Sequence, residues 1–123
     1  MPILEVEIVG DPKSDTEGLA RRLADAAGLA LGSGPHGTWV RLRYLPADQY
    51  AENGGLIAGT LPVFVNLILA DPPAGAELAR VLGELTDAIA AGAGRPPENV
   101  HIAVEPGARG RIAFGGKLVQ PEN

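Results

Sequence analysis

The sequence predicts an α/β protein of two β-strand–α-helix–β-strand units, which together form a four-stranded mixed sheet with two helices on one face. Segments that alternate between apolar and polar residues are typical of strands, and longer segments with apolar residues at helical spacing lie between them. This order occurs twice, about 60 residues apart. Right-handed crossovers put both helices on the same face. We therefore expect a single domain of two repeats, about 1–60 and 61–123.

The first unit is expected to begin with a strand over residues 3–9, where apolar and acidic side chains alternate. Ser14 and Glu17 have the spacing of a capping box, which predicts the start of a helix. Gly32 and Gly34 are expected to end this helix. The apolar residues at helical spacing between them are Leu19, Leu23, Ala26 and Ala30.

The second strand of this unit is expected over residues 39–45. Its two faces carry Val40, Leu42 and Tyr44 on one side and Trp39, Arg41 and Arg43 on the other. The second unit repeats the pattern, with strands over residues 64–69 and around 100–104. The helix between them is bracketed by Pro72, Pro73, Gly92 and Gly94.

This arrangement leaves one sheet face without helices. Trp39, Phe64 and Ile68 are expected on that face, and nothing else in the predicted fold covers them. A bare apolar sheet face implies a partner, and self-assembly is the simplest one.

Composition narrows the possible functions. The formal net charge is -5, which disfavours binding to a phosphate backbone. With no cysteine and two histidines, no metal-ligand spacing or disulfide framework is present, and a cytoplasmic location is expected. No segment approaches the roughly 20 apolar residues of a membrane span. We expect no cofactor, no nucleic acid and no membrane among the partners.

Three short motifs then point to a family. Pro2 directly follows the initiator Met and opens the first strand, residues 97–102 read Pro-Glu-Asn-Val-His-Ile, and Phe114-Gly115-Gly116 follows. In this order and spacing they resemble the 4-oxalocrotonate tautomerase superfamily over nearly the whole chain. The duplication is similar to the fused, double-unit branch of that superfamily. The resemblance implies a tautomerase (MIF-like) fold and a homotrimer with its sheets facing inward, which fits the uncovered face.

The resemblance also implies an activity. It suggests a cofactor-independent isomerase, a keto–enol tautomerase acting on a small carboxylate-bearing enol or 2-oxo acid, with a role in aromatic catabolism. Once Met1 is removed, Pro2 carries a free secondary amine, and the pKa of such a group is ordinarily about 7.7–8.0. An apolar pocket or nearby cations would lower that pKa and suit a general base. Pro62 lies where a second Pro2 could fall, although a register one residue later, which aligns Val63 with Pro2, fits the repeat better. In either register the nitrogen is locked in a peptide bond, so only one such base per chain is expected.

Five substrate-binding residues are suggested by the same resemblance: Arg41, Arg43, Lys13, Tyr50 and Phe114. Arg41 matches the family's strand arginine and is expected to hold a carboxylate, with Arg43 beside it. Both could instead form a cross-strand charge ladder with the glutamates of the first strand. Lys13 stands near the position of the family's loop arginine, but a lysine cannot make the two parallel hydrogen bonds of a guanidinium to a carboxylate. Lys13 could instead be an exposed loop charge. Tyr50 is expected as a lid, and Phe114 as a pocket wall or as plain core.

Two other functions stay open. A hydrolytic dehalogenase or decarboxylase would use a protonated Pro2 as an acid, with Glu5 or Glu7 activating water, although both glutamates are expected to pair with arginines. A non-enzymatic binding protein would keep only the fold. His101 is expected to be satisfied by the backbone or by a neighbouring subunit. Arg109 and Arg111 are expected to face water, unless they reach a neighbouring site.

Overall fold

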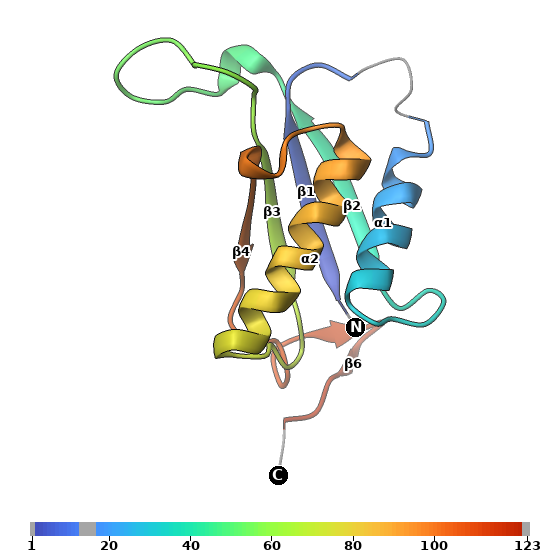
Figure 1. The fold of residues 1–123 in the computed structure, drawn as a ribbon. Helices are drawn as coiled ribbons and strands as arrows, with labels where there is room; N and C mark the ends of the chain where they lie inside the picture. The colour runs from blue at the N-terminus through green and yellow to red at the C-terminus, as the bar shows by residue number, and fades with distance from the viewer. Residues whose placement is uncertain (1, 13–16, 122–123) are drawn as a thin grey trace.

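The structure, a computed structural model, describes residues 2–12 and 17–121. One four-stranded sheet has the order β2-β1-β3-β4. Its strands are β1 (Ile3–Val9), β2 (Trp39–Leu45), β3 (Val63–Ile68) and β4 (Val100–Val104). The outer pairs β1–β2 and β3–β4 are parallel, and the central pair β1–β3 is antiparallel. Helices α1 (Leu19–Ala30) and α2 (Gly75–Ala93) both lie on one face of the sheet (Figure 1). The predicted fold class is confirmed.

Short elements complete the fold. The 3₁₀ turns η1 (Ala47–Gln49) and η2 (Pro97–Asn99) follow β2 and precede β4. Strands β5 (Ala113–Phe114) and β6 (Lys117–Leu118) form an antiparallel hairpin that the sequence pattern did not predict. In Figure 1, the hairpin lies at the end of the sheet where β1 begins.

The core lies between the sheet and the two helices. Strand alternation points every second residue of β1 and β3 at the helices, and Leu4 and Leu67 are fully buried there. Helical spacing brings Leu23 of α1 and Leu85 of α2 onto the same layer, also without exposure. This burial fixes the register of the sheet, because a one-residue slip would turn the apolar side chains outward.

Truncating the core residue Leu85 is expected to be costly. Leu85→Ala should lower the free energy of unfolding by about 2 to 5 kcal/mol, because it removes buried contacts and leaves a cavity. Leu29→Ala is the matched control, since Leu29 is also a helical leucine but is 86% exposed, and its cost should stay within about 0.5 kcal/mol. Urea unfolding of both variants measures the difference, and equal losses would contradict this core assignment.

Helix ends differ in part from the prediction. The predicted capping box is wrong, because α1 begins at Leu19 and its N-cap is Gly18, with φ 78° and no side-chain cap. Glu17 therefore precedes the helix, and Ser14 lies outside the described residues. The predicted C-terminal glycine is confirmed for α2, where Gly94 has φ 68°, a left-handed conformation that favours glycine.

The sheet face opposite the helices is only partly bare. Phe64 is 36% exposed and Trp39 is 42% exposed. The ring of Phe114 in the hairpin lies edge-on to Trp39, with 5.3 Å between centroids. The expectation that nothing in the chain covers this face is therefore wrong at Trp39, because the β5–β6 hairpin reaches it. Within the described part of the chain, no helix combines the length and apolar character that crossing a membrane requires.

Candidate functional site around Pro2

Strand direction decides what surrounds Pro2. Because β1 and β3 are antiparallel, the start of β1 lies beside the end of β3. Pro2 therefore lies near the loop that joins β3 to α2. A hollow of about 490 Å³ opens there, lined by Pro2, the end of α1, the β3–α2 loop and the first turns of α2. The carbonyl of Pro2 accepts a hydrogen bond from the backbone N–H of Trp39 at 3.0 Å, which anchors the start of the strand.

Acidic side chains from α2 give this hollow its charge. Glu77, Arg80 and Glu84 line it from the first turns of the helix. Arg80 donates to Glu77 at 2.5 Å and to Glu84 at 2.8 Å, so one guanidinium holds two carboxylates. The hydrogen bond from Arg80 lowers the pKa of Glu77 below its usual value. Within residues 2–12 and 17–121, no group of three or more His, Asp and Glu side chains is placed to hold a metal ion.

A third carboxylate of the hollow, Asp71, has a partner from elsewhere in the chain. Arg109 donates from Nε to Oδ1 at 2.7 Å and from Nη2 to Oδ2 at 2.5 Å, a bidentate pair. These hydrogen bonds lower the pKa of Asp71 below its usual value. Arg109 also donates to the carbonyl of Gln120 at 3.1 Å. The expectation that Arg109 faces water is wrong, because its side chain, 33% exposed, fastens the C-terminal segment to the loop beside Pro2.

Phe114 lies at the Pro2 end of the sheet. Its ring packs edge-on against Trp39, whose backbone is hydrogen-bonded to Pro2. The indole Nε1 of Trp39 donates to the carbonyl of His36 at 2.9 Å, which fixes the orientation of the indole ring. Phe114 thus belongs to the hairpin and the open face, and plain core is the wrong alternative for it.

Arg41 and Arg43 lie on the sheet face opposite the helices. Arg41 Nη1 is 3.8 Å from Glu5 Oε2, and Arg43 Nε donates to Glu7 Oε2 at 3.0 Å. This is the cross-strand charge ladder, and the expected pairing of both glutamates with arginines is confirmed. Neither arginine lines the hollow of its own chain. Both arginine side chains remain largely exposed, at 73% and 65%, and are accessible to any partner that covers this face.

Tyr50 and His101 lie toward the other end of the open face. The rings of Tyr50 and His101 flank Phe64, with centroids 5.8 and 5.6 Å away. The hydroxyl of Tyr50 donates to Glu52 at 2.6 Å, and this hydrogen bond raises the pKa of Tyr50. Tyr50 is thus not placed as a lid over Pro2 within one chain.

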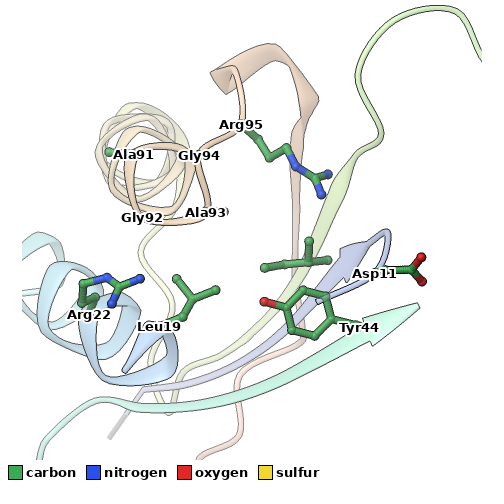
Figure 2. Close-up of a pocket in the computed structure, with 10 residues that line it drawn as sticks. Asp11, Leu19, Arg22, Tyr44, Ala91, Gly92, Ala93, Gly94 and Arg95 are labelled. Atoms are coloured by element: carbon green, nitrogen blue, oxygen red, sulfur yellow. The ribbon is translucent and has the colours of Figure 1, made fainter. Parts of the chain in front are cut away.

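A second hollow, of about 500 Å³, lies at the opposite end of the sheet and is likewise bounded by a loop and by the ends of both helices (Figure 2). It is lined by Asp11 after β1, the first turns of α1 and the end of α2. Here the chain runs on through Pro62, which is buried and has its nitrogen in a peptide bond. Lys13 lies outside the described residues.

Arg95 has a structural role in the second hollow. Figure 2 shows it reaching from the end of α2 toward the strands, where it donates to Val9 O at 2.9 Å and to Leu61 O at 2.6 Å. Arg95→Met should lower the free energy of unfolding by about 1 to 3 kcal/mol, because both carbonyls lose a charged donor. Arg22→Met, in the same hollow but on an exposed side chain, should cost less. Urea unfolding compares the two, and an equal loss would contradict this role.

The charged groups beside Pro2 were not predicted as site residues. Asp71 and the three charged residues of α2 that line the hollow follow β3 in the sequence, where no motif marks them as site residues. The signal that could have found them is the antiparallel pairing of β1 with β3. That pairing brings the loop after each of these strands to the start of the other.

Comparisons with known proteins agree with this fold. No family model matches the sequence, and neither does any curated protein. Among solved structures, a wild-type fused 4-OT in an asymmetric trimer is 21% identical, with a TM-score of 0.76 and 95% of each chain covered. A macrophage migration inhibitory factor homologue from Prochlorococcus marinus is 15% identical, with a TM-score of 0.70, covering 95% of this chain and 98% of its own.

A malonate semialdehyde decarboxylase inhibited by 3-bromopropiolate is 16% identical, with a TM-score of 0.66, covering 92% of this chain and 88% of its own. These neighbours are members of the tautomerase superfamily, and at 21% identity or less what they share with this chain is the fold. The chain therefore has the fold of the tautomerase superfamily, and the resemblance to the 4-oxalocrotonate tautomerases is confirmed at the level of the fold.

Proposed function

We propose that this protein is a cofactor-independent isomerase that interconverts the enol and keto forms of a small carboxylate-bearing substrate. The amine of Pro2, freed by removal of Met1, takes a proton from one atom of the enol and returns it to another. No cofactor is needed, because the carbonyl of the substrate itself stabilises the charge that develops.

The observation that carries this proposal is the position of Pro2. It lies at the mouth of a hollow of about 490 Å³, at the start of a strand whose backbone is anchored by Trp39. A base held on a strand of a rigid sheet keeps its direction, and orientation is worth much of the rate in such reactions. The tautomerase-superfamily fold adds support at the level of the architecture.

The cations for the substrate carboxylate come from a neighbouring subunit in this proposal. Arg41 and Arg43 lie on the open face and stay largely exposed, away from the hollow of their own chain. A homotrimer would cover that face and bring these guanidinium groups toward the next subunit's Pro2. The trimers recorded for fused 4-OT support this assembly.

A second candidate is favoured by the carboxylates of the hollow. Asp71, Glu77 and Glu84 line the space around Pro2, with Arg80 as the cation among the lining residues. Negative charge stabilises a protonated amine, and a protonated Pro2 would act as an acid in a decarboxylation or hydrolytic dehalogenation. A structural neighbour is a malonate semialdehyde decarboxylase, which makes that reaction a concrete alternative.

One experiment separates the candidates. Intact mass first establishes that Met1 is absent. The protein is then assayed for ketonisation of phenylenolpyruvate and for decarboxylation of malonate semialdehyde. The base mechanism is supported if the protein ketonises phenylenolpyruvate and if kcat/KM for this reaction falls at acidic pH with the titration of one group near neutrality. Decarboxylation without ketonisation supports the acid mechanism. A retained Met1, or neither activity, contradicts both and leaves a binding protein with this fold.

A further inference from the structure

The charged groups that line the hollow together with Pro2 come from two elements. The β3–α2 loop supplies Asp71, and the first turns of α2 supply the remaining charged residues of the lining, Glu77, Arg80 and Glu84. The end of α1 supplies apolar residues and a glycine. The charges on α2 hold one another within a single helix, because Arg80 lies between its two glutamates. Asp71 is different, because its counter-charge Arg109 comes from a loop near the C-terminus.

Each half of this pair has an opposite effect on an amine nearby. A carboxylate without its counter-charge stabilises the protonated amine, and a guanidinium without its counter-charge destabilises it. A terminal amine ordinarily titrates at about 7.7–8.0, so a modest shift changes the fraction of free base at neutral pH. The bidentate contact, at 2.7 Å from Nε and 2.5 Å from Nη2, keeps the two charges balanced in the folded protein.

We propose that the Asp71–Arg109 ion pair is a tuning element of the Pro2 site, which sets how firmly the Pro2 nitrogen holds its proton. The inference rests on the proposed function, because it needs the free amine that removal of Met1 leaves. Arg109 is a positioning residue that acts through Asp71. Since Arg109 also donates to the carbonyl of Gln120, docking of the C-terminal segment is coupled to the proton affinity of Pro2.

The test reads the Pro2 nitrogen directly. Protein labelled with ¹⁵N-proline, with loss of Met1 verified by mass, is titrated by NMR so that the pKa of Pro2 is obtained without any activity assay. Arg109→Gln should raise the pKa of Pro2 and Asp71→Asn should lower it, each by about 0.5 to 1 unit. The shifts are smaller than those of a direct ion pair with the amine, because solvent and salt screen the interaction. The double variant should return close to wild type, because the pair is neutral as a whole.

Two further variants serve as controls. Asp11→Asn removes the same charge from the loop after β1, at the far end of a seven-residue strand and so roughly 20 Å away, and should leave the pKa of Pro2 unchanged. Arg109→Lys keeps the charge but loses the fork, so it should give a smaller rise than Arg109→Gln and serves if that variant fails to fold.

The inference is overturned if both single variants move the pKa of Pro2 in the same direction, or if neither exceeds Asp11→Asn. Its failure is distinct from failure of the proposed function. If the variants shift the pKa of Pro2 but the protein has no isomerase or decarboxylase activity, the tuning role is supported and the proposed enzymatic function is contradicted. If the protein is active but the pKa of Pro2 is unchanged in both variants, the enzymatic function is supported and the tuning role of the ion pair is contradicted.

Discussion

Replacing Pro2 by alanine is expected to lower kcat/KM for the ketonisation of phenylenolpyruvate by about 100- to 10,000-fold, the contribution typical of a positioned acid or base. Alanine in the second position also leaves a terminal amine once Met1 is removed, so the variant still carries a basic nitrogen. What it loses is direction. In proline the nitrogen is closed into a ring, and the ring is fixed at the start of β1 by the hydrogen bond from Trp39 to its carbonyl. The alanine amine rotates freely, and a misdirected base loses most of its advantage.

The matched control uses the second proline that begins a unit of the repeat. Pro62 is buried just before β3, and its nitrogen belongs to a peptide bond. Pro62→Ala should keep kcat/KM close to wild type, even if the midpoint of thermal unfolding falls. The assay follows loss of the enol absorbance, with the mass of each variant measured first. Full activity in Pro2→Ala, or an equal loss of kcat/KM in Pro2→Ala and Pro62→Ala, would contradict the role of Pro2 as the general base.

Most of the fold was predictable because it depends on local patterns. Alternation in residues 3–9 and 39–45 predicts strands that match β1 and β2 to the residue. The repeat predicts a second unit of the same kind, and it is present. The start of α1 was not predictable in this way, because a sequence that fits a capping box does not fix which turn is the first. The β5–β6 hairpin has two residues in each strand, too few for any periodic signal.

The site was less predictable than the fold, because its residues meet through long-range pairing. Pro2 could be predicted from the sequence because, once Met1 is removed, it has a free secondary amine at the start of a strand, which no other residue of the chain has. Asp71 and Arg109 lie far apart in sequence and meet because β3 and β4 pair in parallel, so that the segments after both strands leave the sheet at the same end. The antiparallel pairing of β1 with β3 then brings Asp71 to the end of the sheet where Pro2 lies. The charge ladder of Arg41 and Arg43 was foreseen as an alternative, since parallel neighbours of known register place opposite charges side by side.

Placing a charge at Phe64 is expected to convert the proposed trimer into monomers. Phe64 lies on the open sheet face at 36% exposure, beside Glu7 in the register of β1 and β3 and 5.6 Å from the ring of His101. If subunits meet on this face, Phe64→Asp buries an unpaired carboxylate next to an existing one. An uncompensated buried charge costs about 3 to 5 kcal/mol, and the trimer would incur that cost in each subunit. Sedimentation equilibrium at micromolar protein measures the change in mass.

The control must carry the same chemical change on an apolar residue outside this face. Leu56, in the loop between η1 and β3, is completely exposed, so Leu56→Asp should leave the oligomer unchanged. Activity then links the assembly to the site. Because Arg41 and Arg43 do not line the hollow of their own chain, a folded Phe64→Asp monomer should keep its Pro2 amine yet lose turnover, mainly through a higher KM for the carboxylate. A fully active monomer would mean that the hollow binds its substrate without help from a neighbour, and that the open face serves another partner.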